Sequence, residues 1–225
     1  MPVQPSGFPS AWTALCRFER SLKRTSAAEG FKQLNRAAAR YRVASSFEGM
    51  RLKRPASSGI AAGYSSGIRL LLSYSAYESA RRSIKALGVS NLARTRTSLY
   101  RSAASGIREH MQSDVRARQL LQSQVDSPRL RQEVTRFVLG DDEELFAVAT
   151  ALRHLIAHGN WTPFGGGGQT VRARRALAQL SDYLLVETSS LFDRALAHLE
   201  WQSGAGRGSN STLPIAPSNS KAKRR

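Results

Sequence analysis

Apolar residues recur every three or four positions along most of the chain, which is the spacing of one face of an amphipathic helix. The alternation of apolar and polar residues that marks a half-buried strand is nearly absent. The sequence therefore predicts an all-α protein. Two basic helices are expected within residues 11–24 and 30–47, followed by a break at residues 51–63, where Pro and Gly interrupt the pattern.

A longer helix is expected after this break, capped by Ser65 or Ser66 and ended by Gly88. One side of this helix is apolar and holds Ile68, Leu71, Leu72 and Ala76. The basic segment 92–122 that follows predicts one more helix.

The segment DSPRLRQEVTRFVLG predicts a short helix with a signal at each end. Ser127 can cap its start, and Pro128 fits the first helical position because it has no N–H to leave unbonded. Gly140 can end it in a left-handed conformation.

The segment DDEELFAVATALRHLIAHG predicts the most regular helix of the chain. Asp141 can cap its start while Glu144 reaches back to the backbone, and Gly159 can end it. The glycine-rich loop NWTPFGGGG follows; it lacks the Lys-Ser/Thr ending of a phosphate-binding loop and is interpreted as a connector. A long final helix is expected over about residues 170–200.

These elements divide the chain into three parts. We expect a basic helical N-terminal extension at residues 1–60, a helical bundle of four to five core helices at 61–200, and a disordered basic tail at 201–225. The tail is rich in Gly, Ser, Pro and Asn, ends in KAKRR, and lacks the apolar periodicity that packing requires.

The excess of basic over acidic residues adds a class of partner to this picture. With 34 Lys and Arg against 16 Asp and Glu, the net charge is +18, which favours binding to a polyanion such as RNA or to an acidic membrane surface. Residues 141–200, with 8 acidic and 5 basic groups, are the only net acidic part of the chain. The segment with the two neighbouring histidines is therefore distinct in charge from the rest.

The cysteine count and the apolar runs bear on the compartment. Cys16 is the only cysteine, which excludes an intrachain disulfide and a cysteine-based zinc site and favours a reducing environment. No apolar run approaches the roughly 18 residues of a membrane span, and the first residues lack the apolar core of a signal peptide. We therefore expect a cytoplasmic protein with no membrane partner.

Arg153, His154 and His158 lie near the end of the most regular helix. At about 100° per residue, with Arg153 at zero, His154 lies near 100° and His158 near 140°. The apolar residues lie between roughly 200° and 320° and predict the buried face: Leu145, Val148, Ala149, Leu152, Leu155 and Ile156. The residues that share the polar arc are Glu143, Ala147, Thr150 and Ala157, mostly small, so that another helix or a substrate could approach closely.

Arginine and histidine on one surface can carry out phosphodiester chemistry. A neutral imidazole can accept a proton from a ribose 2′-hydroxyl or return one to the leaving oxygen, while a guanidinium stabilises the charge on the phosphate. RNA fits better than DNA because the 2′-hydroxyl is an internal nucleophile, and no metal or other cofactor is needed. Spacing alone decides nothing, since an Arg followed five places later by His is expected roughly 0.5 times by chance in this composition. The position of the residues off the buried face makes them candidates.

The stretch RHLIAHG resembles the signature of HEPN domains, the small all-α modules named for higher eukaryotes and prokaryotes nucleotide binding. That signature is an Arg, a polar residue that is commonly Asn, Asp or His, three more residues, and a His. Here these positions are Arg153, His154 and His158. In such domains the motif lies on a helix in the latter part of a four- or five-helix bundle, before one more long helix. The resemblance covers roughly residues 61–200 and is most specific at 141–160.

The resemblance implies a metal-independent endoribonuclease whose active cleft forms between the two subunits of a homodimer. Arg153 would then stabilise the phosphate, His158 would act as acid or base, and His154 would have a supporting polar role. A toxin or an antiviral defence effector, with a possible antitoxin or regulatory partner, is the implied biological role. Members paired with a nucleotidyltransferase antitoxin often carry a Tyr two places after the motif His, where this chain has Asn160. Neither modification at that place nor a dedicated antitoxin of that type is therefore expected.

Other interpretations stay open on the sequence. The three residues could form an ordinary polar helix face, and the protein could be a non-catalytic helical module that binds nucleic acid or another protein. His154 and His158 are spaced to share a metal ion, but the sequence offers no evident third ligand.

Residues outside the motif are weaker candidates. Glu78 could point toward the site from the first core helix, although a solvent-facing glutamate is the commoner case. Tyr41, Phe47 and Arg51 could stack on bases, but Tyr41 and Phe47 are interpreted first as packing residues.

Overall fold

The computed structural model describes residues 7–21, 28–51, 53, 58–89, 98–123, 125, 127–140, 145–160 and 171–208. Every regular element within these residues is an α-helix, which confirms the expected all-α class. The helices are α1 (Trp12–Ser21), α2 (Ala28–Ser45), α3 (Ser58–Ala86), α4 (Ser98–Ser113), α5 (Val115–Ser123), α6 (Pro128–Leu139), α7 (Leu145–Ala157) and α8 (Val171–Gly208).

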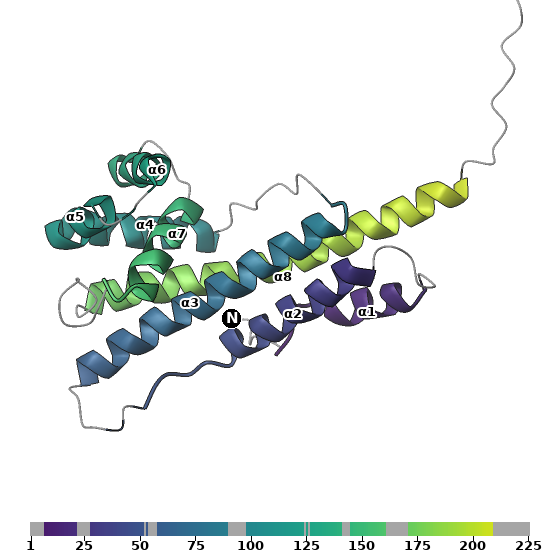
Figure 1. The fold of residues 1–225 in the computed structure, drawn as a ribbon, viewed down its shortest axis with the longest axis horizontal. Coiled ribbons are helices and arrows are strands. Elements are labelled where there is room, and N and C mark those ends of the chain that lie inside the picture. The colour runs from purple at the N-terminus through teal and green to yellow at the C-terminus, as the bar shows by residue number, and fades with distance from the viewer. Residues whose placement is uncertain are drawn as a thin grey trace, which may run out of the picture.

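The two longest helices, α3 and α8, pack side by side, as Figure 1 shows, and α2 packs along α3. The α4 helix packs against α8 in the antiparallel direction, because Ser102 near the start of α4 contacts Gln179, while Glu109 near its end contacts Arg172. The α7 helix packs against α3 and α6. The central bundle therefore consists of α3, α4, α7 and α8, with α5 and α6 packed at one end.

A cluster of buried aromatic rings joins these four helices. Tyr77 of α3 stacks on Phe146 of α7 with the ring centroids 4.4 Å apart. Phe146 lies 5.8 Å from Tyr183 of α8, and Tyr183 meets the edge of Tyr100 of α4 at 5.3 Å. Each such pair contributes about 0.5–1.5 kcal/mol beyond the burial of its surface. The cluster therefore fixes the level of α7 relative to the other three helices.

The N-terminal helices share the core of the bundle. Leu15 of α1 and the α2 residues Phe31 and Leu34 are buried in the same apolar cluster as the aromatic rings. The hydroxyl of Ser10 donates a hydrogen bond of 2.7 Å to a carboxylate oxygen of Asp193 on α8. The segment that we expected as an extension, residues 1–60, thus packs against the bundle in its described part.

The start of α3 differs from the sequence prediction. The helix begins at Ser58, so the expected caps Ser65 and Ser66 are wrong, and the expected break is shorter. The Ser65 and Ser66 hydroxyls instead donate hydrogen bonds to the carbonyl oxygens of Ala61 and Ala62, at 2.8 and 2.9 Å. A serine hydroxyl can bond either at a cap or to the carbonyl four residues earlier, so serine alone does not locate a helix start.

The other helix ends show which local signals hold. The end of α3 is confirmed, since Gly88 has a φ of +79° and follows its last turn. We expected one helix in the basic segment 92–122, but the structure has two, α4 and α5. The Asp114 carboxylate accepts the N–H of Ala117 at 3.0 Å and so starts α5 as a new helix. Both ends of α6 are confirmed: Ser127 accepts the N–H of Leu130 at 3.3 Å, and the Gly140 φ is +89°.

The final helix runs to Gly208, past its expected end near residue 200. The first part of the expected disordered tail is therefore helical. The capping box at 141–144, residues 161–168 of the expected glycine-rich loop and the rest of the tail at 209–225 lie outside the described residues.

Candidate functional site on helix α7

Helix α7 is buried all round over its first turn and becomes exposed only toward its end. Residues 145–149 are all buried, which includes the arc that the sequence assigns to the polar side. The expected apolar face is confirmed, with five residues buried and Ile156 packed partly buried against the core: Leu145, Val148, Ala149, Leu152 and Leu155. Only the last turns of α7 can therefore present a chemical group to solvent.

One flank of α7 is covered by α3 of the same chain. The Tyr74 hydroxyl lies 2.8 Å from the Thr150 hydroxyl, within hydrogen-bonding distance. Farther along, a Cβ built on Gly67 would lie 3.5 Å from Ile156 Cγ2, so the α3 backbone passes close to α7. The small Thr150 was expected to admit another helix or a substrate, and the helix that it admits is α3. Ala147 is likewise buried.

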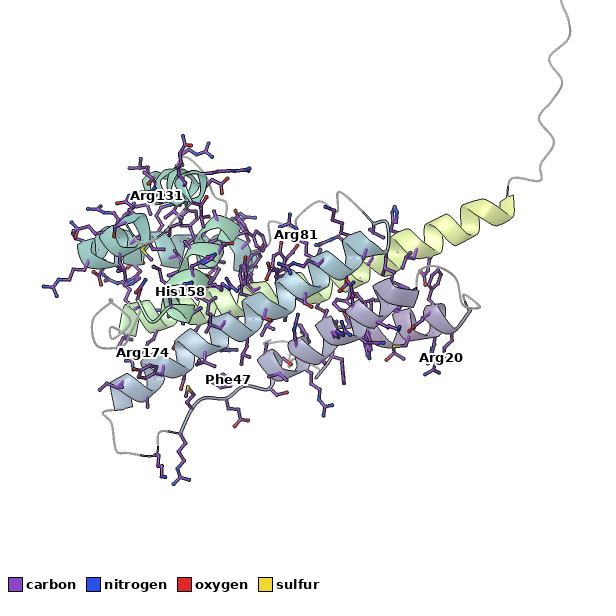
Figure 2. The ribbon with its side chains drawn as sticks, in the orientation of Figure 1. Arg20, Phe47, Arg81, Arg131, His158 and Arg174 are labelled. Carbon is purple, nitrogen blue, oxygen red and sulfur yellow. The ribbon has the colours of Figure 1, made fainter. Side chains whose placement is uncertain are left out.

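The two histidines lie together near the exposed end of α7. Their rings are stacked, with centroids 6.1 Å apart and planes 15° from parallel. The His158 N–H donates to the His154 carbonyl at 3.0 Å, so the backbone continues the helix to His158 before Gly159 turns away with a φ of +72°. His154 is partly buried and His158 is exposed. Figure 2 shows His158 at this end of α7.

Arg153 precedes the histidine pair on α7 and is partly buried. On the helix it falls between Thr150 and Ile156, the two residues that contact α3, at about 60° from each. Thr150 in turn lies between Arg153 and His154, about 40° from His154, and His158 lies about 140° from Arg153. The three residues therefore span more than a third of the helix circumference, starting beside the α3 contact.

The position of these three residues at the end of a helix has an electrostatic consequence. The carbonyl groups of the last turn carry a partial negative charge, which favours a cation by about 0.3–1 kcal/mol at an exposed position.

No described group of three His, Cys, Asp or Glu residues is arranged to hold a metal ion, so the geometry offers no third ligand beside the histidine pair.

Two of the remaining sequence candidates, Glu78 and Tyr41, make contacts within the fold. Glu78 forms an exposed ion pair of 2.6 Å with Arg82, one turn along α3, so its carboxylate faces solvent. Tyr41 is buried against α3 and α8, which confirms it as a packing residue. Phe47 is partly buried and Arg51 is exposed.

A basic groove between α4 and α8 was missed on the sequence. It contains Arg172 and Arg175 from the stretch VRARR at the start of α8. That arginine run was the available signal, but the groove itself depends on α4, which is far away in the sequence. The arginines become neighbours of α4 only through the fold.

None of the helices in the described part of the chain combines the length and the apolar character that crossing a membrane requires. Comparisons of the chain with models of protein families, with curated protein sequences and with solved structures give no match.

Proposed function

We propose that this protein is a metal-independent endoribonuclease of the HEPN type that acts as a homodimer. The observation that carries the proposal is the end of α7, where Arg153, His154 and His158 lie off the packed face of an otherwise buried helix. The all-α architecture and the net charge of +18 support it, because a basic surface attracts RNA.

The proposed reaction is an internal transesterification. His158 accepts the proton of a ribose 2′-hydroxyl, and the oxygen attacks the adjacent phosphorus. The bond from phosphorus to the 5′-oxygen breaks, and that oxygen takes up a proton from a protonated imidazole. The products are a 2′,3′-cyclic phosphate and a 5′-hydroxyl. Arg153 stabilises the negative charge that grows on the phosphate, and His154 supports and orients the neighbouring imidazole.

The order of the three residues around α7 is compatible with a site made by two copies. Arg153 and His158 lie about 140° apart on one helix, so a phosphate that contacts His158 of one copy can receive a guanidinium from a second copy. A second copy related by a two-fold axis can supply its own Arg153 beside the first copy's histidines. Ala157 is small and exposed, so the end of α7 allows this approach.

The ends of the RNA products test the mechanism. The wild-type protein is incubated with a defined single-stranded RNA, and the fragments are analysed by mass spectrometry. We expect a 2′,3′-cyclic phosphate and a 5′-hydroxyl, and no cleavage at a linkage whose 2′-hydroxyl is replaced by hydrogen. Cleavage at the 2′-deoxy linkage would exclude the proposed nucleophile.

A second candidate is a non-catalytic helical module that binds nucleic acid or another protein. The partial burial of Arg153 and His154 favours it, since neither side chain is fully open to a substrate. The two functions give different results with purified protein. Salt-sensitive retention of RNA without turnover, unchanged in His158→Ala, indicates the binding module.

The biological setting follows from the same resemblance. We propose that the nuclease acts in the cytoplasm as a toxin or an antiviral defence effector, in some settings held inactive by an antitoxin or regulatory partner. Growth arrest on expression of the wild-type protein, but not of His158→Ala, is the expected result. Normal growth with active soluble nuclease present would contradict the toxin role.

A further inference from the structure

A groove runs along α4 beside the first turns of α8. Two adjoining hollows of about 580 and 480 Å³ meet at Arg172, which lines both. The polar groups that line them come from α4, α5, α8 and the turn between α4 and α5. They are three arginines, two carboxylates, a histidine, an amide and three hydroxyls: Arg116, Arg172, Arg175, Glu109, Asp114, His110, Gln179, Ser102, Ser105 and Ser113.

The acidic groups that line the groove leave its arginines available to bind an anion. Glu109 lies 3.4 Å from Arg172, and both side chains are more than half exposed, so this ion pair contributes only about 0–1 kcal/mol. The Asp114 carboxylate accepts the Ala117 N–H at the start of α5. Neither Arg116 nor Arg175 has a carboxylate partner among the described side chains. An anion entering the groove would therefore displace little.

The floor of the groove is built from a glycine and an amide. A Cβ on Gly106 would collide with the Gln179 side chain, so the glycine makes room for that amide to lie across α4. Gln179 Nε2 donates to the Ser102 hydroxyl at 3.3 Å. The amide and the hydroxyls can donate hydrogen bonds to phosphate and sugar oxygens.

The groove lies at the same end of the bundle as the histidine pair. Phe146 in the first turn of α7 is level with Tyr183 of α8, and α7 runs from there toward the end where Ile156 meets Gly67 of α3. Figure 2 shows His158 at the same end as Arg174, near the start of α8. A polymer can therefore contact both places, whereas a small anion would reach only one.

We propose that the α4–α8 groove binds the sugar-phosphate backbone of a single RNA strand that extends toward the histidine pair on α7. This inference rests on the proposed ribonuclease function for its choice of ligand. Guanidinium groups match phosphate geometry with two parallel hydrogen bonds, and a basic groove that tracks the backbone is the common device of single-strand binding. An acidic protein could pair its carboxylates with the same arginines, and the test below distinguishes it from RNA.

The test measures RNA binding without cleavage. A fluorescein-labelled single-stranded RNA of mixed sequence is titrated with full-length protein carrying His158→Ala, and anisotropy is recorded at several salt concentrations. The groove pair is the double variant Arg172→Gln with Arg175→Gln, which removes two positive charges from the groove. The control pair is the double variant Arg129→Gln with Arg131→Gln, which removes the same charge from exposed positions on α6.

We expect the groove pair to weaken RNA binding by about tenfold and to reduce the log–log salt slope by about 1.4, since each phosphate contact contributes about 0.7 for a single strand. The control pair should weaken binding less than about twofold. Circular dichroism shows whether each variant keeps its helices. Equal losses of RNA affinity in the two double variants would contradict the groove proposal. Tighter binding of a poly-glutamate peptide than of RNA would contradict it as well.

The same proteins separate this inference from the proposed function. If the groove double variant loses RNA binding and the wild-type protein does not cleave RNA, the groove proposal holds and the nuclease proposal is wrong. If the wild-type protein cleaves RNA and the groove double variant binds RNA as tightly as the control double variant, the nuclease proposal holds and the groove proposal is wrong.

Discussion

The imidazole rings of His154 and His158 stack with their centroids 6.1 Å apart near the exposed end of α7. In the proposed reaction His158 transfers the proton and His154 orients it. Arg153 lies about 140° from His158 around the same helix. Exchange of subunits between variants can therefore test whether Arg153 acts with the His158 of its own copy or of a second copy.

The supporting role of His154 predicts which substitutions it tolerates. His154→Asn keeps a polar side chain that can orient His158, so RNA cleavage should stay within about fivefold of wild type, whereas His154→Ala should lose about 10- to 100-fold. Single-turnover rates with a defined RNA measure both. Equal rates for His154→Ala and wild type would show that His154 has no part in the reaction.

A site made by two copies predicts complementation. Arg153→Ala and His158→Ala should each be inactive alone, because each lacks one of the two groups in every site. Mixing them after partial unfolding and refolding together should restore part of the activity, since the mixed dimer contains one intact Arg153 and one intact His158. If the mixture stays inactive while the variants exchange subunits, the two residues act within one chain.

Burial of His110 predicts a loss of stability in acid. Removal from water lowers the pKa of His110 below its usual 6.5, Asp114 raises it, and Arg172 lowers it further. The folded state therefore binds fewer protons than the unfolded state below about pH 6.5, and stability falls as the pH drops through this window. The free energy of urea unfolding should decrease from pH 7.5 to 5.5.

Replacing His110 isolates this effect from the other histidines. The decrease should be smaller in His110→Gln and unchanged in His198→Gln, whose side chain is only partly buried. An equal decrease in wild type and His110→Gln would assign the acid sensitivity to other groups.

Close approach of α3 and α7 predicts a stabilising substitution. In Gly67→Ala the added methyl would lie 3.5 Å from Ile156 Cγ2, an ordinary contact, while the helix gains about 0.8–1.0 kcal/mol of intrinsic preference. We expect the free energy of unfolding to rise by up to about that amount. Gly106→Ala should gain less, because its methyl forces Gln179 away from Ser102. A lower stability for Gly67→Ala would mean that the two helices pack more tightly than described.

The sequence predicts this fold where a signal is local. The ends of α6 were predictable because Ser127 and Gly140 act on backbone groups within a few residues. Ser65 was misplaced as a cap because its hydroxyl has an equally local alternative inside the helix. The sequence also predicted the buried face of α7, since helical geometry fixes the angles between its residues.

The surroundings of the site were not predictable in the same way. Angles on a helix do not say which neighbour covers each flank, and Thr150 is covered by Tyr74, a residue far away in the sequence. The α4–α8 groove has the same origin, because Glu109 and Arg172 meet only once α4 and α8 have packed. Such long-range pairs set which polar groups stay exposed.

Cleavage of mixed RNA in the presence of a chelator tests the central claim most directly. The samples are the wild-type protein, Arg153→Ala, His158→Ala and their double variant, with Arg131→Ala and His198→Ala as matched controls and circular dichroism as the check on folding. We predict that wild type and controls cleave RNA without a metal ion, while each motif variant loses at least about 100-fold with unchanged helicity. Full cleavage by the purified double variant would contradict the assignment of the reaction to the end of α7.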